Sequence, residues 1–237
     1  MVTVGRQVER LTLDNLALLP GPCQTCTFWE LDPVRRNQIR GHEAEEKAAW
    51  LSTMLREWGS VGRVVRVDDH VVGHILWAPA VHLPGSAGFA TAPVSPDAVL
   101  LATAYVDPAF RGQGLGRVLV QSMAKDLVNH GGIGAVESFG ALRPRPETDR
   151  DDECVLPVDF LLAVGFRTHR AHAAYPRMRM DLGTTVSWRE EFEAALDRLL
   201  GVVAGKRRAP RPSTRPVSRT ARLLRFSRPR GSRNGAH

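Results

Sequence analysis

Residues 99–128 read VLLATAYVDPAFRGQGLGRVLVQSMAKDLV, and this stretch decides the fold. The apolar run at 99–106 is too continuous for a half-solvated strand and predicts a strand that is buried on both faces. Asp107 and Pro108 end the run, because proline has no N–H to give to a sheet. Further on, apolar residues recur at the spacing of one helix face. They are Leu115, Val118, Leu119, Met123 and Leu127.

The segment between this strand and this helix is a glycine turn. Glycines stand at every second position, at 112, 114 and 116, and they let the main chain approach a ligand closely. The first N–H groups of the helix have no internal partner and lie at the positive end of its dipole, so they can bind an anion. A dinucleotide fingerprint would need glycine at Arg117, and a P-loop would end in Gly-Lys-Ser/Thr. Neither pattern is present.

The pattern that fits is R-x-x-G-x-G preceded by V-x-P. It is formed by Val106, Pro108, Arg111, Gly114 and Gly116. This stretch resembles the acetyl-CoA signature of the GNAT N-acetyltransferase superfamily. The resemblance covers roughly residues 8–182 and implies a mixed, mostly antiparallel twisted α/β sheet flanked by helices, with a bulged central strand.

The resemblance also implies acetyl-CoA as the acyl-donor substrate. In the family, the amides of the turn hold the CoA pyrophosphate, and the bulged strand pairs with the pantetheine arm. Tyr105 and Val106 would then be the bulge residues that face the pantetheine and the acetyl carbonyl, while Arg111 and Gly112 would shape the turn. The pyrophosphate amides would be those of Gln113, Gly114, Leu115 and Gly116.

Acetyl transfer to an amine needs a base for the amine and a proton for the departing thiolate. Many family members place a tyrosine four residues before the Gly-Phe pair, but Leu161 stands there in this chain. The family position for an asparagine that contacts pantetheine falls on Cys154, whose thiol is one candidate acid, and Tyr175 is another. Glu137, near the end of the strand after the cofactor helix, is the candidate base. Each of these side chains also has a plain packing or ion-pair interpretation.

Composition sets the broad class. The chain has 237 residues, of which 43% are hydrophobic, which suits one domain with appendages. No apolar run approaches the roughly 20 residues that span a bilayer, and the charged start lacks a signal-peptide core, so we expect a cytoplasmic protein. Three cysteines do not make a disulfide framework. Cys23-x-x-Cys26 leaves packing, metal binding and redox chemistry open.

We expect three segments: a GNAT domain at 1–183, an amphipathic helix at 184–204, and a basic tail at 205–237. The helix would pack on the domain or on a second copy, which would make a homodimer. Lys206 and ten arginines give the tail +11, which leaves −4 for residues 1–204 out of the total of +7. This tail suits non-specific contact with nucleic acid or another acidic surface, or it only aids solubility. The acidic run at 149–153 has two interpretations: it is solvated loop charge, or, if its loop covers the acceptor cleft, it favours a cationic amine substrate.

The remaining elements follow from hydrophobic periodicity and from helix and turn signals. We expect strands at 8–13, 63–67, 71–80 and 133–138 and a final strand pair that ends near 181. We expect helices at 13–19, from 33, at 42–58 and at 157–164, and long loops at 84–97 and 140–153.

The leading hypothesis is an N-acetyltransferase that moves an acetyl group from acetyl-CoA directly to a primary amine in a ternary complex. A first alternative is a non-catalytic acyl-CoA-binding regulatory module whose basic tail contacts nucleic acid. A second alternative is a plain nucleotide-binding protein, which would prefer ATP or NAD to CoA. The sequence does not identify the amine acceptor, because the loops that bind the acceptor vary independently of the cofactor turn.

Overall fold

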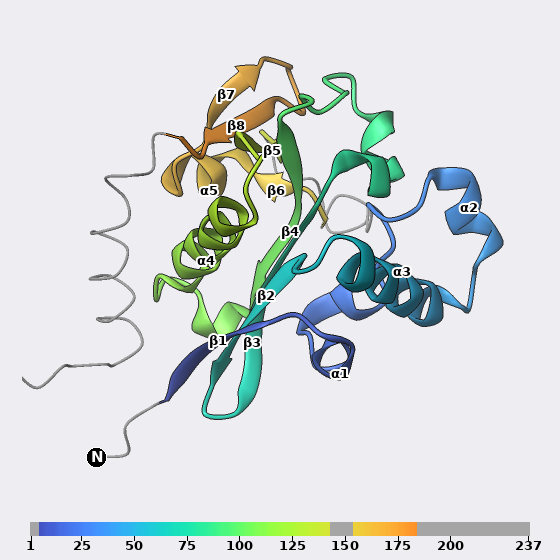
Figure 1. The fold of residues 1–237 in the computed structure, drawn as a ribbon, viewed down its shortest axis with the longest axis vertical. Coiled ribbons are helices and arrows are strands. Elements are labelled where there is room, and N and C mark those ends of the chain that lie inside the picture. The colour runs from blue at the N-terminus through green and yellow to red at the C-terminus, as the bar shows by residue number, and fades with distance from the viewer. Residues whose placement is uncertain (1–4, 143–153, 184–237) are drawn as a thin grey trace, which may run out of the picture. The chain divides into compact units, whose positions relative to one another are not determined.

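A computed structural model describes residues 5–142 and 154–183 (Figure 1). Its strands are β1 (Arg6–Arg10), β2 (Gly62–Val67), β3 (His70–Ala78), β4 (Ala98–Val106), β5 (Ala135–Ala141), β6 (Leu156–Pro157), β7 (Arg167–Arg170) and β8 (Arg177–Asp181). Its α-helices are α1 (Leu13–Leu16), α2 (Pro33–Gln38), α3 (Glu43–Glu57), α4 (Leu115–His130) and α5 (Val158–Ala163). Short 3₁₀ turns are η1 (Gly21–Gln24), η2 (Ala80–His82), η3 (Pro84–Gly88) and η4 (Pro108–Phe110).

The strands form one mixed sheet in the order β1-β2-β3-β4-β5-β8-β7, with β6 paired to β5. Only the β4–β5 and β5–β6 pairs are parallel, and the other pairs are antiparallel. The expected mixed, mostly antiparallel α/β sheet is therefore confirmed.

Helices cover both faces of the sheet (Figure 1). One core contains the apolar side chains of α4 and α5, and the second contains those of α1, α3 and the segment between β3 and β4. Along β4, Val99 and Leu101 belong to the first core, whereas Leu100 and Ala102 belong to the second. As predicted from its continuous apolar run, β4 is buried on both faces.

The two central parallel strands stay together for only a short distance. β4 and β5 pair only at Ala98–Leu100, opposite Ala135–Glu137, among the described residues. Beyond this point a register shift against β3 places a bulge at Leu101–Thr103. The prediction of a bulged central strand is confirmed. The prediction that Tyr105 and Val106 form the bulge is wrong, because pairing with β3 is regular from Thr103 to Val106.

Most of the expected helices and strands are present, with small shifts at their ends. Asp32 caps α2 through its carboxylate, and Pro33 opens that helix, as predicted. β5 begins two residues later than expected and continues into the expected loop, and the short strand β6 was not expected. The predictions for the acidic run at 149–153, the helix at 184–204 and the tail at 205–237 lie outside the described residues. Within 5–142 and 154–183, none of the helices has the length and apolar character needed to cross a bilayer.

Candidate active site

The glycine turn forms an exposed start to α4. Gly112 has φ +74°, and Gly114, the N-cap of the helix, has φ +80° and lies in the left-handed region that favours glycine. Residues 111–114 are all exposed, and no side chain in the described part of the chain caps the helix. The first N–H groups of this 16-residue helix therefore point away from any internal acceptor and can bind an anion.

Side chains on both sides fix the shape of the turn. Arg111 Nε donates to the Val106 carbonyl at 2.9 Å, and the Asp107 carboxylate accepts from the Ala109 amide at 2.8 Å. Gln113 Oε1 accepts from Arg6 of β1 at 2.7 Å. Arg111 thus joins the turn to the end of β4. Arg6, which the sequence did not single out, adds a second positive charge at the same place.

Leu115 and Gly116 have a packing role besides their main-chain amides. Leu115 is buried in the core beneath α4. A Cβ at Gly116 would lie 2.9 Å from Phe160 Cε2 of α5, so glycine lets these two helices approach each other. Leu115 and Gly116 can therefore contact a ligand only through their main-chain N–H groups.

In the part of the chain that the structure describes, one edge of the outer half of β4 pairs with no other strand. Asp107 N donates to Val72 O at 2.8 Å, which makes this a hydrogen-bonded pair of the antiparallel β3–β4 ladder. Because such pairs alternate, Tyr105 also turns its main-chain groups toward β3, whereas Ala104 and Val106 turn theirs to the opposite edge. Ala104 and Val106 are therefore the residues whose main chain can pair with an extended ligand. Sequence reasoning chose Val106 but missed Ala104.

Glu137, the candidate base, is fully buried and lies in an ion-pair cluster. Its carboxylate accepts from the Ser95 amide and from Arg179 Nη1, both at 3.1 Å. Arg177 Nε is 3.3 Å away and His169 Nε2 is 3.8 Å away. These contacts favour the ion-pair interpretation of Glu137, because a base would have to leave its arginine partners to accept a proton from a substrate.

Tyr175 lies beside the C-terminal end of β5. The neighbouring Ala174 carbonyl accepts from the Leu142 amide at 3.0 Å, directly after that strand. The half-buried Tyr175 ring packs edge-on against Phe89 at 5.5 Å, and Phe89 stacks on Phe139 at 4.4 Å. The structure therefore brings Tyr175 close to the end of β5 through an aromatic cluster.

Cys154, a candidate acid, is buried and lies beside a second cysteine. Its Sγ lies 2.9 Å from Cys26 Sγ, and its carbonyl accepts from Trp29 Nε1 at 3.1 Å. The hydrogen bond with Cys26 and burial both raise the pKa of Cys154 above its ordinary value, so this thiol keeps its proton. Within the described ranges, no group of three or more potential ligand side chains is arranged to hold a metal ion.

A buried ion pair lies next to these cysteines. Lys47 of α3 pairs with Glu30, and its Nζ also donates to the Cys26 carbonyl at 3.0 Å. Burial alone would lower the pKa of Lys47, but the charge and hydrogen bond of Glu30 raise it. Sequence reasoning missed this pair, because a lysine among the glutamates of a helix resembles a solvated face.

His74 of β3 is a second buried polar group that the sequence analysis missed. Its ring stacks on Tyr105 at 5.8 Å, and neither ring nitrogen has a hydrogen-bond partner among the described residues. Burial, with a smaller effect of the Lys47 charge, lowers the pKa of His74 to about 3. The imidazole is therefore neutral at physiological pH.

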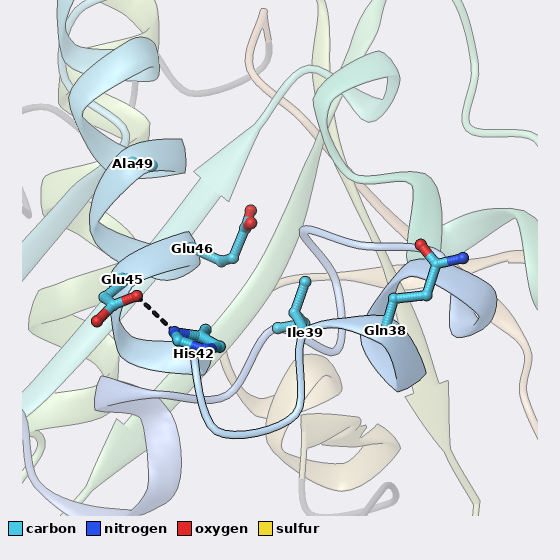
Figure 2. Close-up of a pocket in the computed structure, with 6 residues that line it drawn as sticks. All are labelled: Gln38, Ile39, His42, Glu45, Glu46 and Ala49. Atoms are coloured by element: carbon cyan, nitrogen blue, oxygen red, sulfur yellow. Dashed lines mark hydrogen bonds and ion pairs between the residues drawn. The ribbon is translucent and has the colours of Figure 1, made fainter.

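A surface hollow of about 410 Å³ lies between α2 and the start of α3 (Figure 2). Ile39 and Gln38 line it on one side and Glu46 on the other, and His42 Nδ1 contacts Glu45 Oε2 at 2.8 Å beside it. None of its lining residues comes from β4, β5 or α4. We therefore assign it no part in the site.

Comparisons with solved structures find matches at low sequence identity. PaiA N-acetyltransferase from Thermoplasma acidophilum, in complex with coenzyme A, is 11% identical, with 74% of this chain and 98% of that chain covered and a TM-score of 0.46. The putative acetyltransferase YncA from Salmonella typhimurium, with acetyl-CoA, is 12% identical, with coverages of 75% and 94% and a TM-score of 0.46. YhbS from Escherichia coli, in complex with CoA, is 18% identical, with coverages of 78% and 86% and a TM-score of 0.42.

Sequence comparison gives the family. No curated protein matches the chain significantly. The sequence model of the acetyltransferase (GNAT) family matches residues 26–143, a segment that contains β2 to β5, α2 to α4 and the glycine turn. Through this domain the chain belongs to the acetyltransferase (GNAT) family.

Proposed function

We propose that the protein transfers the acetyl group of acetyl-CoA directly to a primary amine in a ternary complex. One observation carries the proposal: exposed, uncapped amides at the start of α4 lie next to the free edge of β4. A diphosphate and an extended, amide-containing arm are the two chemical features that these two surfaces suit.

The donor would be held mainly by main-chain groups. The N–H groups of 113–116 would bind the pyrophosphate, and the positive charges of Arg6 and Arg111 would favour it. The main chain of Ala104 and Val106 would pair with the amides of the pantetheine arm, as an added strand does. This arrangement needs no particular side chain along β4.

Acetyl transfer then needs an activated carbonyl and a proton donor. A main-chain N–H at the free edge of β4 would polarise the thioester carbonyl, as an oxyanion hole does. The amine attacks the carbonyl carbon, the carbon–sulfur bond breaks, and the CoA thiolate takes up a proton. We assign this proton to Tyr175, because the hydrogen bond with Cys26 and burial raise the pKa of the Cys154 thiol and make it a poorer acid.

The variant Glu137→Gln tests whether Glu137 is the base that takes the proton from the amine. If Glu137 holds the ion-pair cluster, this variant should lose stability but keep its turnover in the folded fraction. Loss of turnover with stability unchanged would instead support Glu137 as the base.

A specific observation favours one second candidate, a non-catalytic acyl-CoA-binding module. Leu161 stands where many family members have the catalytic tyrosine, and it is fully buried in the core. Such a module would bind acetyl-CoA but would release no CoA with any amine.

Release of CoA thiol separates the two candidates. The full chain is mixed with acetyl-CoA and, in turn, with polyamines, aminoglycosides, amino acids and peptides that have free N-termini or lysines. The proposal expects amine-dependent release with at least one class, and loss of this release in Gly114→Asp. Thiol release no faster than hydrolysis with every class, despite acetyl-CoA binding, would favour the binding module.

A further inference from the structure

The thiols of Cys26 and Cys154 face each other across a long sequence separation. They lie 128 residues apart in the chain, both are free, and their sulfur atoms are 2.9 Å apart. A disulfide bond is about 2.05 Å long, so small side-chain rotations would bring the two sulfurs to bonding distance. Cys23 is close to Cys26 in the sequence, but it is the Cys154 sulfur that lies beside Cys26 in the fold.

From this geometry we propose that Cys26 and Cys154 form a reactive dithiol that low-molecular-weight disulfides oxidise reversibly to an intramolecular disulfide. The proposal goes beyond acetyl transfer and does not depend on it. It assigns a modification site to two cysteines that acetyl transfer does not use.

The surroundings of the pair give the two sulfurs different roles. The hydrogen bond from Cys154 lowers the pKa of the Cys26 thiol to about 7, against the effect of burial. The main chain of Phe28 and the charge of Lys47 lower it further. A substantial fraction of Cys26 is therefore thiolate at neutral pH, which is the form that attacks disulfides.

Exposure gives the order of the two steps. Cys26 is half-buried, whereas Cys154 is only 5% exposed, so a small disulfide reaches Cys26 first. The Cys26 thiolate attacks one sulfur of the disulfide, whose S–S bond breaks, and one thiol leaves after taking up a proton. The mixed disulfide removes the Cys26 thiolate, whose hydrogen bond and charge raise the pKa of Cys154. The Cys154 sulfur then attacks the Cys26 sulfur of the mixed disulfide, the second thiolate leaves, and it takes up the proton that Cys154 gives up. The protein loses two electrons, and the small disulfide gains them.

The cross-link would join two segments that lie close to the candidate site. Cys26 lies in the segment after η1, which also contributes Trp29 to the second core. Cys154 lies two residues before Leu156 of β6, which pairs with Gly140 near the end of β5. Oxidation would therefore tie the chain after η1 to the C-terminal end of β5, which is also the end near Tyr175.

Peptide mapping after treatment with oxidised glutathione tests the proposal. The folded full-length protein is incubated with the reagent at neutral pH, its remaining thiols are alkylated, and the digest is analysed by mass spectrometry. We expect a peptide pair joined through Cys26 and Cys154, which disappears when dithiothreitol is added. A cross-link between Cys23 and Cys26, a lasting glutathione adduct on Cys26, or no reaction would each overturn the proposal.

Three single variants make the assignment sharper. Cys23→Ser, the matched control from the same motif, should keep the cross-link. Cys154→Ser should stop at one glutathione adduct on Cys26, and Cys26→Ser should leave the buried Cys154 unmodified. Circular dichroism checks that each variant is folded. If a variant does not fold, peptide mapping of the wild type still tests whether the Cys26–Cys154 disulfide forms. Formation of the adduct on Cys154 in Cys26→Ser at the wild-type rate would contradict the assigned order.

Discussion

Replacing His74 by leucine should remove much of the acid sensitivity of the fold. The imidazole has no hydrogen-bond partner among the described residues and is almost fully buried, so it stays neutral until its pKa of about 3 in the folded chain. Unfolding returns it to water and to an ordinary pKa of 6.5. Below that pH the unfolded chain binds a proton that the folded chain does not bind. Stability therefore falls as the pH falls from 6.5 toward 3.

The size of this effect follows from the shift. Between about pH 7 and about pH 4.5, His74 should lower the free energy of unfolding by about 2.5 kcal/mol, a large share of the roughly 5–15 kcal/mol that stabilises an ordinary domain. Leucine fills a similar volume and takes up no proton. Over the same pH range, the unfolding free energy of His74→Leu should therefore fall by about 2.5 kcal/mol less than that of the wild type.

Urea denaturation followed by circular dichroism at several pH values measures this difference. Carboxylates contribute equally to both proteins, so the gap between the two profiles isolates His74. His70→Asn, a substitution at the exposed hairpin, controls for the loss of one histidine and should follow the wild-type profile. Parallel wild-type and His74→Leu profiles between pH 7 and 4.5 would refute the reasoning, because His74 would then take up its proton equally in both states.

Three further substitutions test the packing, the buried charge and the chemistry. Gly85→Ala should cost about 1–3 kcal/mol of unfolding free energy, because its Cβ would overlap the Phe28 carbonyl oxygen, while Gly88→Ala, with open space around it, should cost little. Lys47→Met should cost about 3–5 kcal/mol in urea denaturation, because it leaves a carboxylate buried without its cation. The raised pKa of Lys47 means that its stabilising effect is present below pH 10.5 and is lost above it. Tyr175→Phe should lower kcat at least about tenfold with unchanged acetyl-CoA affinity, and an unchanged kcat would remove Tyr175 as the proton donor.

The local elements of this chain could be read from the sequence because each has a local physical signal. The β4–turn–α4 unit combines an apolar run, a proline stop, three glycines and a helical stripe, and all four features agree. For α2 the local signal is at the helix start, where Asp32 is the capping residue and Pro33 is the first helical residue. The mixed sheet then follows from the family resemblance of the turn.

The site could be predicted only where it consists of main chain. The position of the bulge could not be predicted, because it depends on how β4 pairs with β3. Ala104 could not be predicted either, because no side-chain feature marks a residue at a free strand edge. The Cys26–Cys154 contact joins residues 128 positions apart, which no local pattern encodes. Glu137 lies on the expected strand, but its arginine partners on β8 could be found only once the strands were paired.

The proposed diphosphate site consists of the main-chain amides at the start of α4, and Gly114→Asp places a negative charge beside them. At about 5 Å from a diphosphate, with an effective dielectric constant between about 20 and 80, one carboxylate opposes each phosphate charge by about 1–3 kcal/mol. Two such charges should weaken acetyl-CoA binding by about 30-fold or more. Gly132→Asp is the matched control, because Gly132, like Gly114, has a positive φ, here +75°, but it follows the C-terminus of α4. A Cβ at Gly132 would meet open space.

Isothermal titration calorimetry of acetyl-CoA into the wild type, Gly114→Asp and Gly132→Asp is the most direct test. We expect saturable one-to-one binding to the wild type and to Gly132→Asp, and a loss of at least about 30-fold in affinity for Gly114→Asp. Equal affinity of all three folded proteins for acetyl-CoA, or no binding by the wild type, would contradict the assignment of this turn as the diphosphate site.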